Sequence, residues 1–297
     1  MKNLHCAICG KTESVFELYP ENYFREQLNG KTFSARRTPD RMHYRFVKCR
    51  NCNLIFSNPI LEEKEIKRLY SVSSFTYSLE SKYVGKTYLE YFLRNISPPY
   101  NDKRVLDVGC GNGFFLDELQ KIGVKNVYGI EPGKSSVKSA PERLKSKIKL
   151  GELIPGSFIN NSFDVVCCFH TLDHVVDPNS FIKNARDILK KKGKILFIVH
   201  DTNGLSVKLF GEKSAIFDIE HIYLFNQNNL KKIFRLNGFR NVKTFKVKNR
   251  YPLIYWVRMV PFPLTLKKAL VEFLRLSKLG NIPFSVEAGN IGVVATK

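Results

Sequence analysis

Residues 104–119, RVLDVGCGNGFFLDEL, constrain the fold of this chain more than any other stretch. A short apolar run ends in Asp107, then Gly109, Gly111 and Gly113 follow at intervals of two, and a helical pattern begins. Glycines let the main chain approach a ligand closely, and a helix N-terminus offers N–H groups that have no intrahelical partner. A strand, turn and helix of this kind is typical of nucleotide sites in doubly wound α/β sheets.

The pattern around this turn predicts an α/β fold with a largely parallel sheet. Short apolar runs, read as strands, lie at 104–108, 126–130, 147–150, 163–169 and 194–199, followed by β-like runs at 239–248 and 290–297. Amphipathic segments between them, read as helices, lie at 113–123, 134–140, 179–193 and 226–238. Gly193 is expected to end the third of these helices, after a lysine-rich last turn. Two earlier helical patterns, at 59–70 and 78–96, precede a proline break at 97–99.

The spacing of the glycines bears on which nucleotide is bound. A dinucleotide fingerprint needs a third glycine at position 114, where this chain has Phe114. The G-x-G-x-G turn, with an acid before it and Glu131 at the end of the second strand, resembles motif I of the class I S-adenosylmethionine (SAM)-dependent methyltransferases. That resemblance implies a Rossmann-like, seven-stranded fold and SAM as cofactor, with Glu131 on the ribose hydroxyls. The implied cofactor residues around the turn are Asp107, Gly109, Cys110, Gly111, Gly113 and Glu131. A glycine turn that only packs a helix on a strand, and a nicotinamide site, are the alternatives.

The same family resemblance extends over roughly residues 100–248 and the closing strand. The phrase LDHV at 172–175 resembles the segment that follows the fourth strand in that family, and 220–239 resembles its next histidine-aromatic segment and helix. The resemblance implies that Phe169 and His170 lie under the cofactor, and that Glu152 lies on its adenine side.

Four cysteines near the N-terminus form two chelating pairs, Cys6-x-x-Cys9 and Cys49-x-x-Cys52. Two such pairs meeting at one point make a closed four-thiolate zinc site, which is structural rather than catalytic. Redox pairs and coincidental buried cysteines are the competing interpretations. We therefore expect a zinc module at 1–60, a helical connector at 61–100 and a methyltransferase domain at 101–297.

The cysteine segments also resemble a zinc-binding head that precedes a subset of bacterial methyltransferases. The forms are Cys-x-x-Cys-Gly and CRNCNLIFSNP, and the subset includes sugar C-methyltransferases and relatives encoded among surface-polysaccharide genes. The resemblance implies a small acceptor, a nucleotide-linked or glycan sugar. It also implies that His221, after Glu220, removes a proton. Here Asp218 and Ile219 replace a Tyr and a His of that family's phrase.

Few other side chains in the sequence are candidate bases. His174, next to Asp173, either acts in catalysis or supports its loop. The same two interpretations apply to His170. His221 itself is either a base or a loop-packing residue. The type of methylation, at carbon, oxygen or nitrogen, stays open.

The charge balance, 48 Lys+Arg against 27 Asp+Glu, gives a net charge of +21 that attracts anions. It suits a phosphorylated acceptor, and it equally suits an RNA methyltransferase, the first alternative function. A SAM-binding module without turnover is the second. Seven cysteines without a disulfide pattern, and an N-terminus that lacks a signal-peptide core, indicate the cytoplasm.

An insert at 250–284 lies between the last two predicted strands. Its most apolar stretch, 251–264, is too short to span a bilayer and contains Arg258. The segment 263–280 is amphipathic, with basic residues opposite leucines. It is interpreted as a cover for the pocket, a dimer face, or a helix that lies on an anionic membrane.

Overall fold

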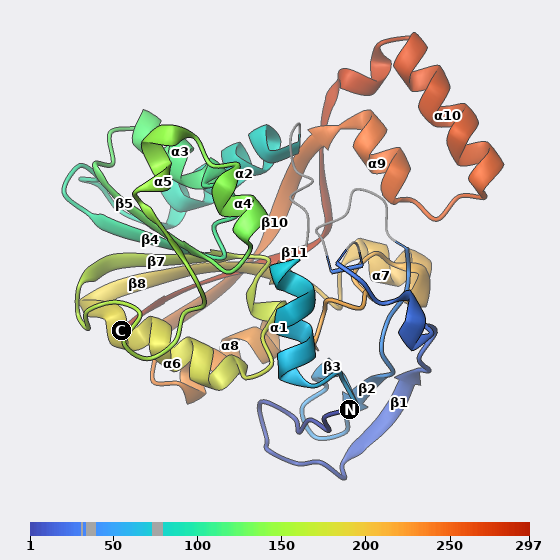
Figure 1. Ribbon diagram of the computed structural model, residues 1–297, viewed down its shortest axis with the longest axis horizontal. Helices are drawn as coiled ribbons and strands as arrows, with labels where there is room; N and C mark the ends of the chain where they lie inside the picture. Colours follow the sequence, from blue (N-terminus) through green and yellow to red (C-terminus); the bar gives the residue numbers. More distant parts are fainter. Residues whose placement is uncertain (31, 34–39, 73–79) are drawn as a thin grey trace.

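A seven-stranded mixed sheet forms the centre of the computed structural model, which describes residues 1–30, 32–33, 40–72 and 80–297. Its strand order is β10-β11-β8-β7-β4-β5-β6, and the predicted Rossmann-like α/β fold class is confirmed (Figure 1). β4, β5, β6, β7 and β8 run parallel, whereas β11 is antiparallel to both of its neighbours. The strands are β4 (Arg104–Val108), β5 (Asn126–Glu131), β6 (Ile148–Leu150), β7 (Phe163–Phe169), β8 (Leu189–His200), β10 (Arg240–Pro252) and β11 (Pro283–Thr296).

Helices cover both faces of this sheet because its parallel strands are apolar on both sides. One face carries α2 (Glu80–Asn95), α3 (Phe114–Lys121), α4 (Lys134–Lys138) and α5 (Glu142–Lys145), and the other carries α6 (Pro178–Ile188) and α8 (Gln227–Leu236). Along β7, Val165 and Cys167 pack toward the first face, and Val166 and Cys168 toward the second. α2 corresponds to the helix predicted at 78–96. Residues 78 and 79 of that prediction lie outside the described residues.

The prediction for residues 189–193 was wrong. α6 begins at an Asp177 N-cap, as expected for Asp before Pro178, but it ends at Ile188, and β8 starts at Leu189. Leu189 is fully buried and pairs with Phe163 of β7, so tertiary packing overrides the helical pattern of the lysine run. Gly193 lies inside the strand, where its carbonyl accepts the N–H of Lys297 at 2.9 Å.

The N-terminal segment forms a second, four-stranded antiparallel sheet. It contains β1 (Val15–Tyr19), β2 (Phe46–Cys49), β3 (Ile55–Ser57) and β9 (Tyr223–Leu224), in that order. β9 comes from far beyond the predicted boundary at residue 60, and Ser57 N–H donates to the carbonyl of Ile222 at 2.8 Å. The N-terminal segment thus shares a sheet with the segment 222–224. A 3-10 turn, η1 (Arg25–Gln27), precedes β2, and α1 (Glu63–Ser71) follows β3.

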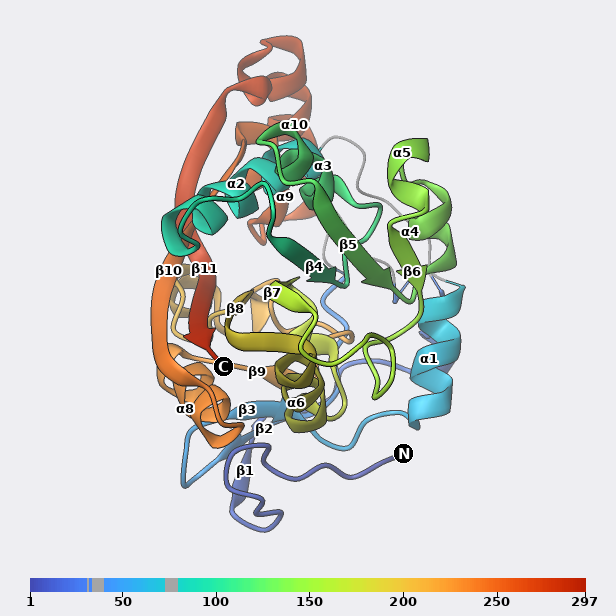
Figure 2. The same cartoon turned by 90° about the vertical axis from the view of Figure 1, so that its left-hand side faces the viewer.

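A helical hairpin stands away from the rest of the molecule. β10 and β11 pair as far as Pro252 and Pro283, and between them lie α9 (Leu253–Met259), α10 (Leu264–Leu276) and the 3-10 turn η4 (Leu279–Asn281). Figures 1 and 2 both show α9 and α10 at the end of this long strand pair. Among the described residues, no helix is long and apolar enough to cross a membrane. The remaining elements are η2 (Leu172–His174), α7 (Leu205–Phe210) and η3 (Gly211–Lys213).

Candidate active site

A cavity of about 920 Å³ opens at the carboxyl ends of β4, β5, β7 and β8. This is the edge where doubly wound sheets bind their ligands. The cavity brings together most of the residues singled out from the sequence, namely Gly109, Gly111, Glu131, Glu152, Phe169, His170, His174, Glu220 and His221. Asp107, Cys110 and Gly113 do not line it.

The glycine turn between β4 and α3 requires glycine for geometric reasons. Gly109, Gly111 and Gly113 have φ values of 75°, 55° and 81°, in the region that other residues rarely adopt. A Cβ on Gly109 would lie 2.1 Å from Oγ1 of Thr171. Gly113 is the N-cap of α3, so the turn delivers the chain directly into that helix. The bare main chain of this turn therefore forms one wall of the cavity.

Glu131 ties the end of β5 to the glycine turn. One carboxylate oxygen accepts the N–H of Gly111 at 2.9 Å, and the other accepts the N–H of Gly133 at 2.8 Å. Burial raises the pKa of Glu131, while these two N–H groups lower it. Each carboxylate oxygen has a second lone pair, so the side chain retains acceptor capacity toward a ligand.

Asp107 lies behind the turn rather than on the cavity wall. It is 2% exposed, and its Oδ1 has no hydrogen-bond partner among the described residues. Burial raises the pKa of Asp107 well above its usual range, and the nearby Glu131 carboxylate raises it further. A buried acceptor of this kind is costly unless a donor or a positive charge compensates it.

Phe169, Cys110 and Glu152 have distinct positions around this end of the cavity. Phe169 stacks on Tyr88 of α2 with ring centroids 4.0 Å apart, and both rings line the cavity. Cys110 is buried under the turn, where its Sγ would lie 2.5 Å from a Cβ on Gly129, so it packs rather than faces the cavity. Glu152 forms an ion pair of 3.0 Å with Lys67 of α1 at the cavity wall.

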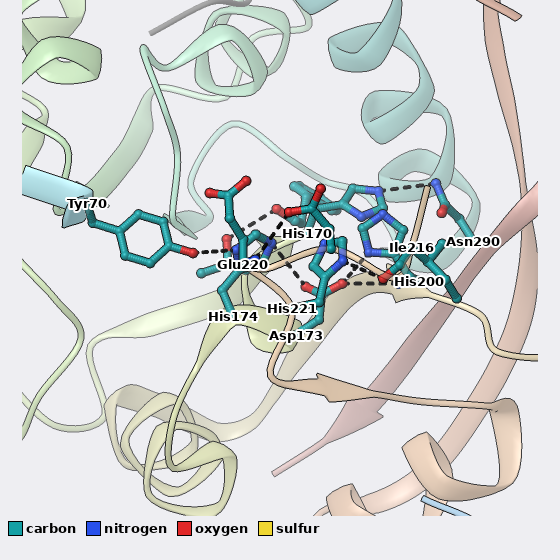
Figure 3. Close-up of polar contacts among 12 residues, drawn as sticks. Tyr70, His170, Asp173, His174, His200, Ile216, Glu220, His221 and Asn290 are labelled. Atoms are coloured by element: carbon teal, nitrogen blue, oxygen red, sulfur yellow. Dashed lines mark hydrogen bonds and ion pairs between the residues drawn. The ribbon is translucent and has the colours of Figure 1, made fainter. Parts of the chain in front are cut away.

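A cluster of histidines around one aspartate forms the opposite part of the cavity (Figure 3). Asp173, in η2, is fully buried, and its Oδ2 lies 2.5 Å from Nδ1 of His200 at the end of β8. The ring centroids of His200 and His221 are 4.5 Å apart, and those of His174 and His221 are 4.9 Å apart. The three imidazoles and the carboxylate therefore form one polar network.

The partners of these imidazoles fix which nitrogens carry protons. Burial alone would raise the pKa of Asp173, but His200, His174 and His221 hold it well below its usual range. An ionised carboxylate only accepts, so Nδ1 of His200 donates, and Nε2 is the nitrogen that carries the lone pair when the ring is neutral. Nδ1 of His221 faces the carbonyl of Ile216 at 2.7 Å, so it donates as well. Both rings line the cavity, and in each of them Nε2 is the nitrogen that the Nδ1 contact leaves unused.

The other two histidines of the cluster have different partners. Nδ1 of His174 lies 2.7 Å from the hydroxyl of Tyr70 in α1. Nε2 of His170 lies 3.2 Å from the side-chain nitrogen of Asn290 in β11. Burial lowers the pKa of His170 to about 3, and the neighbouring His200 lowers it further. Burial also lowers the pKa of His221, with the same neighbour as the second cause. Both rings are therefore neutral at neutral pH.

Metal-ligating geometry occurs in two places among the described residues. The Sγ atoms of the four N-terminal cysteines lie within 4.8 Å of one another, with Cys6 and Cys52 3.3 Å apart and Cys9 and Cys49 3.5 Å apart. A tetrahedral zinc site with bonds of about 2.3 Å places its sulfurs about 3.8 Å apart, so these four thiols fit a zinc ion. Asp173 and pairs of histidines also lie within 4.8 Å, but there the direct bond from His200 to Asp173 favours proton handling.

The sequence of this chain matches a known family of domains. The model of a methyltransferase domain family matches residues 81–244, which is more than half of the chain, and the chain belongs to that family. Ubiquinone biosynthesis O-methyltransferases from Proteus mirabilis and Yersinia pestis are each 28% identical to it, over 159 and 155 residues. Each alignment covers 48% of this chain. The chain spans 62% and 63% of those relatives, less than two thirds of their length.

Solved structures agree on the fold. A SAM-dependent methyltransferase from Archaeoglobus fulgidus matches 73% of this chain and 97% of its own, with 20% identity and a TM-score of 0.50. The YcgJ protein of Bacillus subtilis matches 71% of this chain and 98% of its own, with 17% identity and a TM-score of 0.52. The chain therefore contains a methyltransferase domain with the fold of these solved structures.

The residues present fit SAM. Gly109 and Gly111 place bare main chain at the cavity, Glu131 retains acceptor capacity, and the orphaned Oδ1 of Asp107 is a buried acceptor that a positive charge would compensate. These groups suit a cofactor that carries hydroxyls and positive charge but no phosphate.

Sequence reasoning missed His200, Asn290 and Tyr70. His200 ends an apolar strand, and the carboxyl end of a parallel strand is where functional residues gather, so that signal was available. Tyr70 and Asn290 had no such signal, because only the tertiary structure brings α1 and β11 to the cavity.

Proposed function

We propose that this protein transfers the methyl group of SAM to a hydroxyl of a small acceptor, a nucleotide-linked or glycan sugar. The observation that carries the proposal is that the glycine turn and His200 line one cavity, and that Asp173 is hydrogen-bonded to His200 beside it. The sugar class rests on the resemblance of the cysteine head, and transfer to oxygen is supported by the relatives named O-methyltransferases.

The cofactor end would be shaped by the bare main chain of Gly109 and Gly111, and Glu131 would accept from the cofactor, with the buried Asp107 behind the turn. Bound there, SAM supplies a methyl group on a sulfonium, which is ready for displacement by a nucleophile. Phe169 and Tyr88, stacked at 4.0 Å, offer an apolar floor that excludes water from this end. Gly109 keeps the turn against Thr171, which fixes the position of the wall.

The acceptor hydroxyl must lose a proton, and His200 is the best-placed group to take it. Its Nε2 carries the lone pair, and the ionised Asp173 carboxylate stabilises the imidazolium that forms. His221, the base predicted from sequence, lies beside it with its own Nε2 available and its Nδ1 bound to Ile216. We propose that His200 receives the proton and that His221 and Glu220 orient the acceptor.

The four cysteines are proposed to hold a structural zinc ion. The support is geometric, since the four Sγ atoms lie within 4.8 Å of one another, as four thiolate ligands of one zinc ion would. Side chains outside the head bind its backbone, since Asn229 donates to the carbonyl of Cys52 at 2.6 Å and Asn179 donates to that of Ala7 at 2.8 Å. Zinc would therefore stabilise the contact between the head and the domain.

The test incubates purified protein with methyl-labelled SAM and fractionated acceptor pools of nucleotide-sugars, glycolipids and RNA. Label in the sugar fractions, lost in a His200→Gln variant that still binds the cofactor, is the expected result. Label only in RNA would overturn the acceptor class in favour of the alternative that the charge of +21 suggests. Cofactor that stays intact with every pool would favour a binding module without turnover.

A further inference from the structure

The projecting hairpin carries an unusual concentration of exposed apolar side chains. Of the eighteen exposed large hydrophobic residues among those described, seven lie within residues 264–284. They are Leu264, Leu266, Phe273, Leu276, Leu279, Ile282 and Phe284, and Leu276 is 75% exposed. Large exposed apolar patches on a soluble surface mark interaction sites.

Three of these side chains form a stripe on the outer face of α10. Leu266, Phe273 and Leu276 are spaced by seven and three residues, which places them along one side of a helix. Leu274, in contrast, is buried, and α10 packs through it and its neighbours toward α9 and η4. The helix is therefore apolar on both its inner and its outer face, although solvent surrounds the outer one.

Positive charge surrounds this apolar stripe. Five basic residues, Arg258, Lys267, Lys268, Arg275 and Lys278, lie in the segment 253–284, against one acid, Glu272. Lys268, Arg275 and Lys278 are exposed beside the stripe. The whole chain has a net charge of +21, so nothing in its overall balance offsets this local excess.

The positive charge of the hairpin indicates which partner covers its apolar stripe. A second copy of the chain would bring the same cationic rim, so two hairpins face to face would repel each other. An anionic bilayer matches both features, because its headgroups attract the basic residues while the apolar stripe enters the acyl boundary. α10, with 13 residues, is too short to span a bilayer, so it would lie in the interface.

The base of the hairpin is also the outer wall of the active-site cavity. Tyr255, Trp256, Met259 and Phe284 line the same cavity as Glu131 and His200. Nε1 of Trp256 donates to the carbonyl of Phe284 at 3.0 Å, which joins α9 to β11 at the base of the hairpin. The polar cluster and the exposed Phe284 thus border one cavity, whose wall at the base of the hairpin is largely aromatic.

We propose that the hairpin 253–284 docks on an anionic lipid bilayer, and that the methyl acceptor is a lipid-linked sugar that enters the cavity past the aromatic side chains at the base of the hairpin. The docking is inferred only from the exposed apolar and basic side chains of the hairpin. The acceptor class, in contrast, rests on the proposed function. A sugar carried on a lipid would place its hydroxyl at His200 while its tail stays among the aromatic residues and the acyl chains.

The test measures sedimentation of the full chain with vesicles of phosphatidylcholine alone and of equal parts phosphatidylcholine and phosphatidylglycerol. Binding to the anionic vesicles, weakened by salt, is expected. The double variant Phe273→Ser/Leu276→Ser should bind about ten-fold or more weakly. The matched control Leu236→Ser, on the exposed face of α8, should bind like the parent protein. Thermal unfolding of each variant verifies that it folds.

The outcomes separate the docking from the catalytic proposal. Equal binding by the double variant and the parent, or no binding to anionic vesicles, would overturn the docking. Self-association that the double variant loses, without lipid binding, would assign the stripe to a second copy instead. Vesicle binding without methyl transfer to any pool would leave the docking standing and remove the proposed function. Transfer to soluble nucleotide-sugars alone, with vesicle binding intact, would remove only the lipid-linked acceptor.

Discussion

The two ends of the cavity are built from different parts of the chain. The cofactor end is centred on one short turn, where the main chain of Gly109 and Gly111 lines the cavity, and Glu131 and Phe169 join it from the ends of the two strands that flank β4. The acceptor end is formed by side chains from η2, β8, β11 and the loop before β9, which only the tertiary structure brings together. The first end thus depends on local backbone geometry, and the second on long-range packing and charge.

Asp173→Asn should have the largest effect and act on the acceptor end alone. An amide cannot stabilise a positive His200, so methyl transfer should fall by about 10²-fold or more. Cofactor affinity should stay within about two-fold, because Asp173 does not contact the glycine turn. Turnover with labelled SAM and calorimetric titration of the cofactor measure the two quantities.

Asp164→Asn is the matched control for this variant. Asp164 lies at the other end of β7, where its carboxylate accepts the N–H of Arg104 at 2.9 Å and pairs with Lys190 at 2.8 Å. We expect some loss of stability and near-normal turnover. If both aspartate variants lost turnover equally, the cluster would act only through stability.

Gly109→Ala should act on the cofactor end. The new methyl group would meet Thr171 at 2.1 Å, and the φ of 75° disfavours alanine, so the turn must move. Cofactor affinity should fall by about ten-fold or more. Gly123→Ala is the control, since Gly123 also has a positive φ of 91° but lies outside the cavity wall. An equal loss of affinity in both variants would show that the effect is general strain.

Glu131→Gln should have a smaller effect at the same end. The amide keeps the size of the side chain but loses the charge, which weakens hydrogen bonds from hydroxyl donors by about 1.5 kcal/mol, or roughly ten-fold in affinity. Turnover at saturating cofactor should change little. Glu118→Gln, which removes a carboxylate paired with Lys121 on α3, is the control. Unchanged cofactor affinity in Glu131→Gln would contradict the assignment of this residue.

The pH dependence of stability tests the acceptor end without any measurement of turnover. Burial lowers the pKa of His170 to about 3 from 6.5, so between these values the unfolded chain binds a proton that the folded chain does not. Stability should therefore fall as the pH drops below about 6.5. His170→Gln should make this slope shallower, measured by denaturant unfolding between about pH 4 and 7. An unchanged slope would show that His170 is not buried as a neutral ring; exposed His5→Gln is the control.

The fold could be predicted from the sequence because its signals are local. The strand, glycine turn and helix at 104–121, and the alternation of apolar and amphipathic segments after it, correspond directly to β4, α3 and the elements that follow. The helix predicted at 189–193 is a strand because Leu189 pairs with Phe163 in the sheet, although the lysine run has helical character. At these residues tertiary packing, not local helix propensity, determines the secondary structure.

The candidate site could be predicted only in part for the same reason. The turn and Glu131 follow one strand each, so their proximity follows from topology. The partnership of Asp173 with His200 joins residues 27 positions apart in sequence, and Tyr70 reaches His174 from 104 positions away. No periodicity encodes such pairs, and they determine which histidine is basic.

Calorimetric titration of the zinc-loaded protein with SAM tests the central assignment most directly. We expect saturable binding of one cofactor per chain, weakened about ten-fold or more by Gly109→Ala and left unchanged by Asp173→Asn. The absence of binding heat in folded protein, or equal weakening by both variants, would contradict a cavity whose two ends work separately.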